Sequence, residues 1–160
     1  PYVMPRALEA SELPGIIQDY VQAAERAKRA GFDGVEVHGA NGYLLDQFTR
    51  DGSNQRTDNY GGSAENRIRF PLEVVAAVSK IFGLRRTGLR ISPQNPYNSM
   101  SDSDPVETFT AYARALNDFN LAFLHIMEPI VQDGRRAAAD GSIYVTPFIR
   151  KAYEGKIIAN

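Results

Sequence analysis

Stretches with helical periodicity alternate with short apolar runs along this chain of 160 residues. Candidate capping residues open the helical stretches, as at Ser11, Ser63 and Asp104, and glycines such as Gly31 and Gly83 close them. We expect helices at residues 11–31, 63–83, 104–117 and 146–153, and strands at 34–38, 87–92, 122–127 and 156–159. Such regular alternation predicts a parallel sheet whose strands are joined by crossover helices.

Two architectures can hold such a sheet, an open doubly wound sheet and a (β/α)8 barrel. No G-x-G-x-x-G motif follows any expected strand, which weighs against a doubly wound dinucleotide-binding sheet. The spacing between successive strands, roughly 34 residues, matches one unit of a barrel. We therefore expect a single α/β domain over residues 1–160 that forms about four βα units of a (β/α)8 TIM barrel and is truncated at both ends.

The composition excludes several classes of site and partner. The chain has 18 basic and 19 acidic residues and a formal net charge of −1, so we expect no nucleic-acid partner and no membrane partner. The chain has no cysteine, which excludes a disulfide framework, a thiolate nucleophile and a cysteine-ligated zinc site. No apolar run approaches the roughly 18 residues of a membrane span. We expect a cytoplasmic protein.

The end of the first expected strand is the most informative segment for function. A valine-rich run leads there into His38, Asn41 and Tyr43, with Gly39 and Gly42 between them. Each side chain alone is also compatible with a structural role, but strand carboxyl ends are where α/β sheets and barrels bind ligands. An imidazole and an amide can both donate hydrogen bonds to one substrate oxygen, and a phenol is a candidate proton donor. We therefore expect a site here, with glycines that allow the backbone to bring the side chains together.

Charged residues also lie on the other expected strands. Arg90 stands in the middle of the second strand, where a buried charge is costly unless it is paired. It either pairs with a carboxylate, for which Glu36 is the obvious partner, or points into the barrel mouth toward an anionic or electron-rich ligand. His125 and Glu128, at the end of the third strand, match no metal-ligand spacing, so we expect a structural role for them and no metal site.

Two connections are longer than compact βα units need, at residues 43–62 and 128–145. Such loops are typically lids or binding loops, and the first of them leaves directly from the candidate site. We expect the second, which is rich in arginine, alanine and glycine, to be mobile.

Several segments together carry a family resemblance that extends over essentially the whole chain. They are GFDGVEVHGANGYL at 31–44, DQF at 46–48, NQRTDNYGGS at 54–63, NR at 66–67, GLRISP at 88–93 and LHIMEP at 124–129. In this order they resemble the Old Yellow Enzyme family of FMN-dependent ene-reductases. The resemblance implies a (β/α)8 barrel with FMN at its carboxyl-end mouth, of which this chain covers the fourth to seventh strands.

The resemblance also implies an activity and a role for each candidate residue. NAD(P)H reduces the flavin, which passes a hydride to an activated alkene such as an enone, a maleimide or a nitro compound; the small-molecule substrate is typically an α,β-unsaturated carbonyl. His38 and Asn41 match the pair that binds the electron-withdrawing oxygen of the substrate, and Tyr43 matches the proton donor. Arg90, together with His38, matches the residues that contact the flavin.

The first strands of the family and its phosphate-binding residues have no counterpart in this chain. The alternative hypothesis is therefore that the 160-residue chain alone is a non-catalytic half barrel that cannot hold FMN. Two copies could also pair to close eight strands, so a homo-oligomer stays open. A barrel aldolase or isomerase is disfavoured because Lys156 stands only at the start of a strand.

Overall fold

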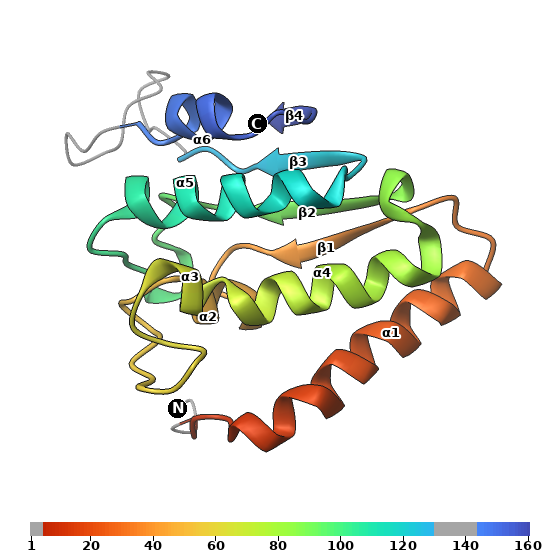
Figure 1. The fold of residues 1–160 in the computed structure, drawn as a ribbon, viewed down its shortest axis with the longest axis horizontal. Helices are drawn as coiled ribbons and strands as arrows, with labels where there is room; N and C mark the ends of the chain where they lie inside the picture. Colours follow the sequence, from red (N-terminus) through yellow and green to blue (C-terminus); the bar gives the residue numbers. More distant parts are fainter. Residues whose placement is uncertain (1–4, 130–143) are drawn as a thin grey trace.

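The computed structural model describes residues 5–129 and 144–160, and a four-stranded parallel sheet with the order β1-β2-β3-β4 forms its centre (Figure 1). The strands are β1 (Val35–Gly39), β2 (Thr87–Ile91), β3 (Phe123–Ile126) and β4 (Ile157–Ala159). The α-helices are α1 (Leu13–Arg29), α2 (Leu44–Thr49), α3 (Ala64–Arg67), α4 (Arg69–Phe82), α5 (Pro105–Leu116) and α6 (Thr146–Ala152). The 3-10 helices are η1 (Ala10–Glu12), η2 (Leu84–Arg86), η3 (Tyr97–Ser99) and η4 (Asn117–Phe119). Parallel strands that are neighbours in both sequence and space, with helices between them, are the arrangement of a (β/α)8 barrel.

Capping side chains explain where two of the α-helices begin. Ser63 and Asp104 cap α3 and α5, because each side chain accepts a hydrogen bond from the backbone amide three residues later. Ser11 does not cap α1 as the sequence suggested. It lies inside η1, where Glu9 and Glu12 form a capping box that satisfies the first amides of the turn.

Two helices differ from the expectation, and one expected loop lies mostly outside the described residues. The short helix α2 lies inside the predicted loop 43–62; its six residues are too few for periodicity to reveal a helix. The helix expected at 63–83 is divided into α3 and α4 at Ile68. Most of the predicted mobile loop 128–145 lies outside the described residues.

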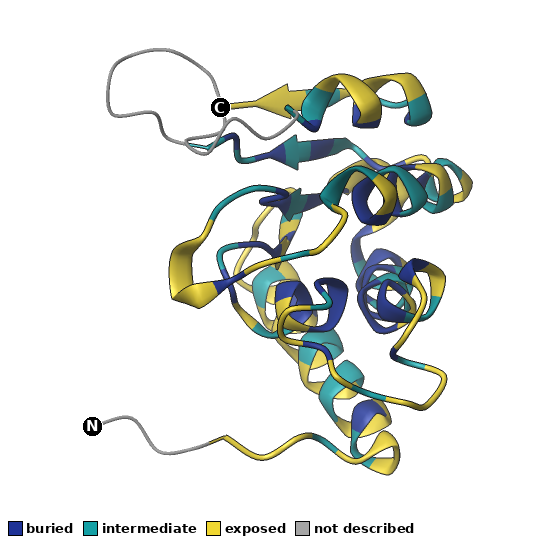
Figure 2. Ribbon diagram, turned by 90° about the vertical axis from the view of Figure 1, so that its left-hand side faces the viewer, coloured by how far each residue is buried: buried dark blue, intermediate teal, exposed yellow. Residues whose placement is uncertain are grey.

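The two faces of the sheet differ in cover and in chemistry. Helices α4 and α5 lie over one face of the sheet (Figure 1), and the strand residues whose side chains belong to this face are buried, as the ribbon colours in Figure 2 indicate. These side chains are Val37, Leu89, Ile91, Leu124 and Ile126. The alternate side chains Glu36, His38, Arg90 and His125 belong to the other face and are exposed or half-buried. In a barrel this second face is the interior.

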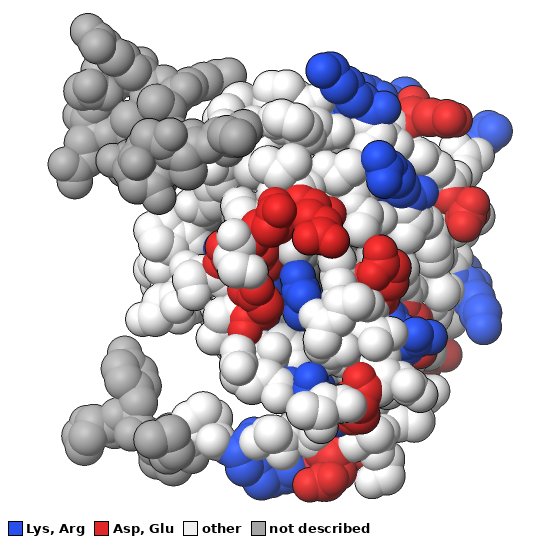
Figure 3. Space-filling view, turned by 60° about the vertical axis from the view of Figure 1, so that its left-hand side comes forward, with Lys and Arg blue, Asp and Glu red and all other residues white. Residues whose placement is uncertain are grey.

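The surface carries charges of both signs. Figure 3 shows acidic and basic side chains mixed over one side of the molecule, without a continuous basic area on that side. None of the helices within the described ranges is long and apolar enough to cross a membrane.

Packing between the sheet and its helices predicts a large cost for shortening a core side chain. Leu89 is fully buried, whereas Leu84 in η2 is 39% exposed. We expect Leu89→Ala to lower the free energy of unfolding by roughly 2–5 kcal/mol, because it leaves a cavity. The matched variant Leu84→Ala should cost about 1 kcal/mol or less. Urea denaturation of the complete protein measures both, and equal losses would contradict the assignment of the core.

Candidate active site

The carboxyl end of β1 brings the side chains of His38 and Tyr43 together. Their ring centroids lie 5.4 Å apart at an interplanar angle of 54°, and Tyr43 is 54% exposed. Burial and the positive charge of Arg90 lower the pKa of His38, while the carboxylates of Glu36 and Asp46 act against this shift. This shift favours the neutral imidazole, which has one ring N–H to donate to a ligand.

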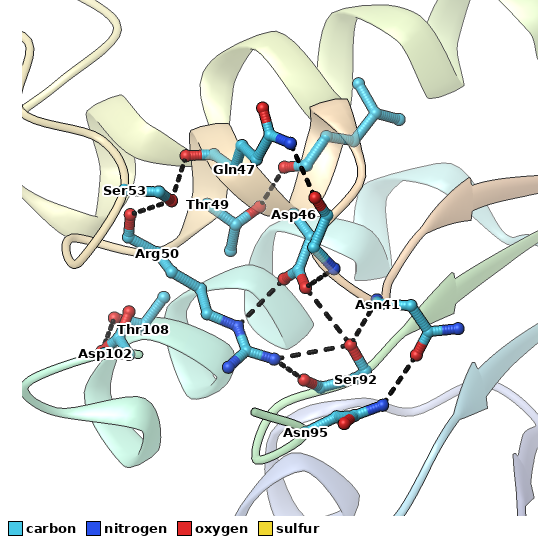
Figure 4. Close-up of polar contacts among 12 residues, drawn as sticks. Asn41, Asp46, Gln47, Thr49, Arg50, Ser53, Ser92, Asn95, Asp102 and Thr108 are labelled. Atoms are coloured by element: carbon cyan, nitrogen blue, oxygen red, sulfur yellow. Dashed lines mark hydrogen bonds and ion pairs between the residues drawn. The ribbon is translucent and has the colours of Figure 1, made fainter. Parts of the chain in front are cut away.

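Asn41 is held by the segment that follows β2. Its backbone is left-handed, with a φ of 60°, and its N–H donates to Ser92 Oγ over 2.7 Å. Its side-chain oxygen accepts from Asn95 Nδ2 over 2.9 Å (Figure 4), and its carbonyl oxygen accepts from Asn98 Nδ2 over 2.9 Å. Within the described parts of the chain, Asn41 Nδ2 makes no hydrogen bond, so the amide keeps its donor for a ligand.

The two glycines beside these residues have different roles. Gly42 has a φ of 74°, and a Cβ atom there would lie 2.6 Å from Asn98 Cβ, so both conformation and space require glycine. Gly39 has no left-handed backbone; a Cβ there would lie 3.1 Å from the carbonyl oxygen of Arg90. The expectation of unusual backbone geometry therefore holds for Gly42 and is wrong for Gly39.

Arg90 is the neighbour of His38 across the sheet, because the two residues are partners in the register of β1 and β2. Its Nε atom is buried and has no hydrogen-bond partner among the described residues. The pairing with Glu36 that the sequence allowed is not formed, since Glu36 Oε2 lies 2.8 Å from His125 Nδ1 instead. Buried donors are rarely left unpaired, so this atom is available to an acceptor on a ligand.

His125 completes the row of polar side chains across the inner face. It follows Arg90 in the register of β2 and β3. Its second ring nitrogen, Nε2, lies 3.0 Å from Asn160 Oδ1, so the ring is held between Glu36 and Asn160. No group of three metal-ligating side chains occurs within residues 5–129 and 144–160. This geometry fits a structural role for His125.

A buried ion pair between Asp46 and Arg50, which the sequence did not predict, holds the segment after β1 in place. Arg50 Nε lies 3.0 Å from Asp46 Oδ1, and both side chains are almost inaccessible, at 2% and 0% exposed. Asp46 Oδ2 also accepts from the Gly42 amide over 2.9 Å and from Ser92 Oγ over 3.3 Å (Figure 4). Arg50 Nη2 donates to the carbonyl oxygen of Ser92. The pair therefore joins the end of β1, the helix α2 and the end of β2.

Two properties of the Asp46–Arg50 pair are the pKa shift of Asp46 and the spacing of four residues between the charges. Burial raises the pKa of Asp46, and the charge of Arg50 together with the hydrogen bonds to the carboxylate acts against that shift. Opposite charges four residues apart are a helix signal. That signal was present in the sequence at Asp46 and Arg50, inside the segment predicted as a loop.

A second buried arginine anchors the rest of the 43–62 connection. Arg67 Nε donates to the carbonyl oxygen of Thr49 over 2.9 Å, and Nη2 donates to Thr108 Oγ1 over 2.6 Å. Arg67 Nη1 donates to the carbonyl oxygen of Gly62, and Asp102 lies 3.8 Å from Nη2. These contacts tie the end of α2 to α3 and α5, so this connection is anchored at both ends.

Three candidate hydrogen-bond donors lie at the carboxyl end of β1, next to Arg90 on β2, and parallel sheets and barrels bind their ligands at this end of the strands. The chain belongs to the NADH:flavin oxidoreductase / NADH oxidase family, whose model matches residues 1–159. This confirms the resemblance to the Old Yellow Enzyme family and the assignment of the fold as part of a (β/α)8 barrel.

Individual relatives support the same family. The 12-oxophytodienoate reductase 1 of Oryza sativa subsp. japonica is 46% identical over 161 residues, which cover 99% of this chain and 41% of that protein. A Leishmania infantum protein named "Probable flavin mononucleotide-dependent alkene reductase" is 53% identical over 127 residues, or 79% of this chain and 35% of that protein. The structure of the old yellow enzyme homologue from Zymomonas mobilis matches with a TM-score of 0.92 and 40% identity, covering 100% of this chain and 44% of that one. The chain thus spans less than half the length of these relatives.

The buried ion pair predicts a specific sensitivity of stability. Asp46→Ala leaves the Arg50 cation buried without its partner and should lower the free energy of unfolding by roughly 3–5 kcal/mol. Asp58, whose side chain is 40% exposed, forms a surface pair with Arg56. The matched variant Asp58→Ala should cost about 1 kcal/mol or less. Denaturant unfolding of the complete protein distinguishes the two, and a small loss in Asp46→Ala would contradict the role of the buried pair.

Proposed function

We propose that the complete protein containing this chain is an FMN-dependent oxidoreductase that reduces activated alkenes with NAD(P)H. The observation that carries the proposal is the contact between His38 and Tyr43 at the end of β1, beside Arg90 and followed by Asn41 in the same segment. The family to which the chain belongs is described as NADH:flavin oxidoreductase, and a relative is named for FMN-dependent alkene reduction. Both descriptions agree with this use of the donors.

Residues of the inner face fit a flavin. Arg90 Nε is a buried donor without a partner among the described residues, and it lies beside His38 on the face that forms the interior of a barrel. The pyrimidine edge of FMN carries acceptors that such a donor satisfies, and a fixed positive charge there stabilises an anionic ring. We therefore assign Arg90 and His38 to FMN. When bound and reduced by NAD(P)H, the flavin supplies the hydride.

Polarisation of the substrate is the task of His38 and Asn41. The neutral imidazole and the free Asn41 Nδ2 each donate a hydrogen bond to the electron-withdrawing oxygen of the substrate. That oxygen gains negative charge when the β-carbon accepts a hydride, so both hydrogen bonds strengthen in the transition state. Enones, maleimides and nitroalkenes all carry such an oxygen in conjugation with the double bond, which defines the substrate class.

Tyr43 completes the reduction. Its hydroxyl donates a proton to the α-carbon, so the alkene gains one hydride and one proton while NAD(P)H is oxidised to NAD(P)⁺. Because Tyr43 is 54% exposed, water can return the proton to the phenolate afterwards.

Removal of the Tyr43 hydroxyl tests this assignment. Tyr43→Phe in the complete protein should slow reoxidation of the flavin by 2-cyclohexenone by about 10²-fold or more, because the proton donor is lost. Reduction of the flavin by NAD(P)H should not change. Stopped-flow absorbance of the flavin measures the two half-reactions separately.

The control is Tyr60→Phe, since the Tyr60 hydroxyl lies 3.3 Å from a carboxylate oxygen of Glu73 on α4. That variant should reoxidise at the normal rate. If reoxidation by the enone is unchanged in both Tyr43→Phe and His38→Ala, the assignment of the site is wrong.

The alternative, a non-catalytic half barrel, concerns the 160-residue chain by itself. The observation that favours it is the four-stranded sheet of the described residues, which is half of the eight strands that a closed barrel needs. We expect the purified 160-residue chain to be colourless and the complete protein to show flavin absorbance. A yellow 160-residue chain with stoichiometric FMN would exclude the alternative.

A further inference from the structure

Ser92 occupies the centre of the contacts between the two strand ends. It directly follows β2 and is fully buried. Its hydroxyl oxygen accepts the backbone N–H of Asn41 over 2.7 Å and lies 3.3 Å from Asp46 Oδ2 (Figure 4). Arg50 Nη2 lies 3.4 Å from the same oxygen. One hydroxyl thus connects the residue proposed to bind substrate with the buried ion pair.

We propose that Ser92, oriented by the Asp46–Arg50 ion pair, is a positioning residue that aims the Asn41 amide at the substrate oxygen. The inference rests on the proposed function, in which Asn41 is a substrate-binding donor. It adds Ser92, Asp46 and Arg50, which do not contact the substrate themselves. These residues set the orientation of the Asn41 amide that binds the substrate oxygen.

The ion pair fixes the direction of the Ser92 hydroxyl. An ionised carboxylate can only accept, so the single hydroxyl proton of Ser92 points to Asp46. The guanidinium of Arg50 can only donate, and it donates to the carbonyl oxygen of Ser92. A lone pair of Ser92 Oγ therefore remains directed at the Asn41 N–H, and it cannot rotate away without breaking the bond to Asp46.

Asn41 needs this support because its backbone conformation is an uncommon one. A φ of 60° in a residue other than glycine is strained and persists where neighbours hold it. The N–H bond to Ser92 holds the backbone, and the bond from Asn95 Nδ2 to Oδ1 sets the rotation of the amide. With its oxygen engaged on that side, the amide presents Nδ2 on the other side.

A double-mutant cycle in the complete protein tests the inference. Ser92→Ala should lower kcat/KM for 2-cyclohexenone by about 10-fold, because a misplaced hydrogen-bond donor costs about this much or more. In the Asn41→Gly background, where the backbone conformation is allowed but the amide is absent, the same change should cost less than about 2-fold. Rates are normalised to bound flavin, so any unfolded fraction does not enter the comparison.

A binding measurement gives a readout that does not depend on turnover. Cyclohexanone offers the same oxygen and has no alkene to reduce, so its dissociation constant reports the hydrogen bonds alone. Ser92→Ala should raise this constant several-fold with Asn41 present and leave it unchanged in the Asn41→Gly background. The control Ser79→Ala removes a buried hydroxyl that has no hydrogen-bond partner within the described ranges, and it should change neither quantity.

The outcomes separate the inference from the function on which it rests. Equal losses from Ser92→Ala in both backgrounds would show a purely structural role and overturn the inference, as would no loss at all. If Asn41→Gly alone leaves enone reduction unchanged, the substrate-binding role of Asn41 fails, and the positioning role fails with it. If Asn41→Gly slows the reaction and the effects of Ser92→Ala are equal, only the positioning role is lost.

Discussion

The buried ion pair between Asp46 and Arg50 is the interaction on which the candidate site depends. Two charges removed from water are costly, and they persist in a protein when their remaining hydrogen bonds are satisfied. Here the carboxylate accepts from the Gly42 amide and Ser92, and the guanidinium donates to the Ser92 carbonyl oxygen. Those partners come from the ends of two neighbouring strands. Satisfying the pair therefore requires both strand ends to take up one fixed arrangement.

One face of the sheet is aliphatic and the other is polar because successive side chains of a strand point to opposite faces. Alternate residues of β1, β2 and β3 point to opposite faces, so each strand contributes aliphatic side chains to the helices and polar side chains to the interior. His38, Arg90 and His125 form one row on the inner face because they share a register. The partial burial of His38 and the neighbouring charge of Arg90 lower the pKa of the histidine, which favours its neutral form. The alternation of side chains along β1, β2 and β3 therefore determines both the packing against the helices and the row of polar side chains on the inner face.

Much of the fold could be predicted because local signals and tertiary structure agree. The caps at Ser63 and Asp104 mark helix starts in the sequence and in the structure, and the glycine at 83 ends α4 in both. The helix α2 escaped prediction because it is short and is stabilised by burial of Leu45, Phe48 and its own ion pair. The pairing of Glu36 with His125 escaped as well, since it spans two strand intervals and depends on the exact register.

The sequence by itself determined the class of fold and indicated the segment for which we propose the chemistry. Alternating periodicity is a local property, and the polar residues His38, Asn41 and Tyr43 after a strand indicate a candidate site, because barrels bind ligands at the carboxyl ends of their strands. Only the tertiary structure decided which partners these residues have. Among the described residues it left Arg90 Nε without a partner, and it engaged the Asn41 oxygen, because register and the buried ion pair bring together side chains distant in the chain. Contacts of that kind depend on three-dimensional distance, which local sequence patterns do not encode.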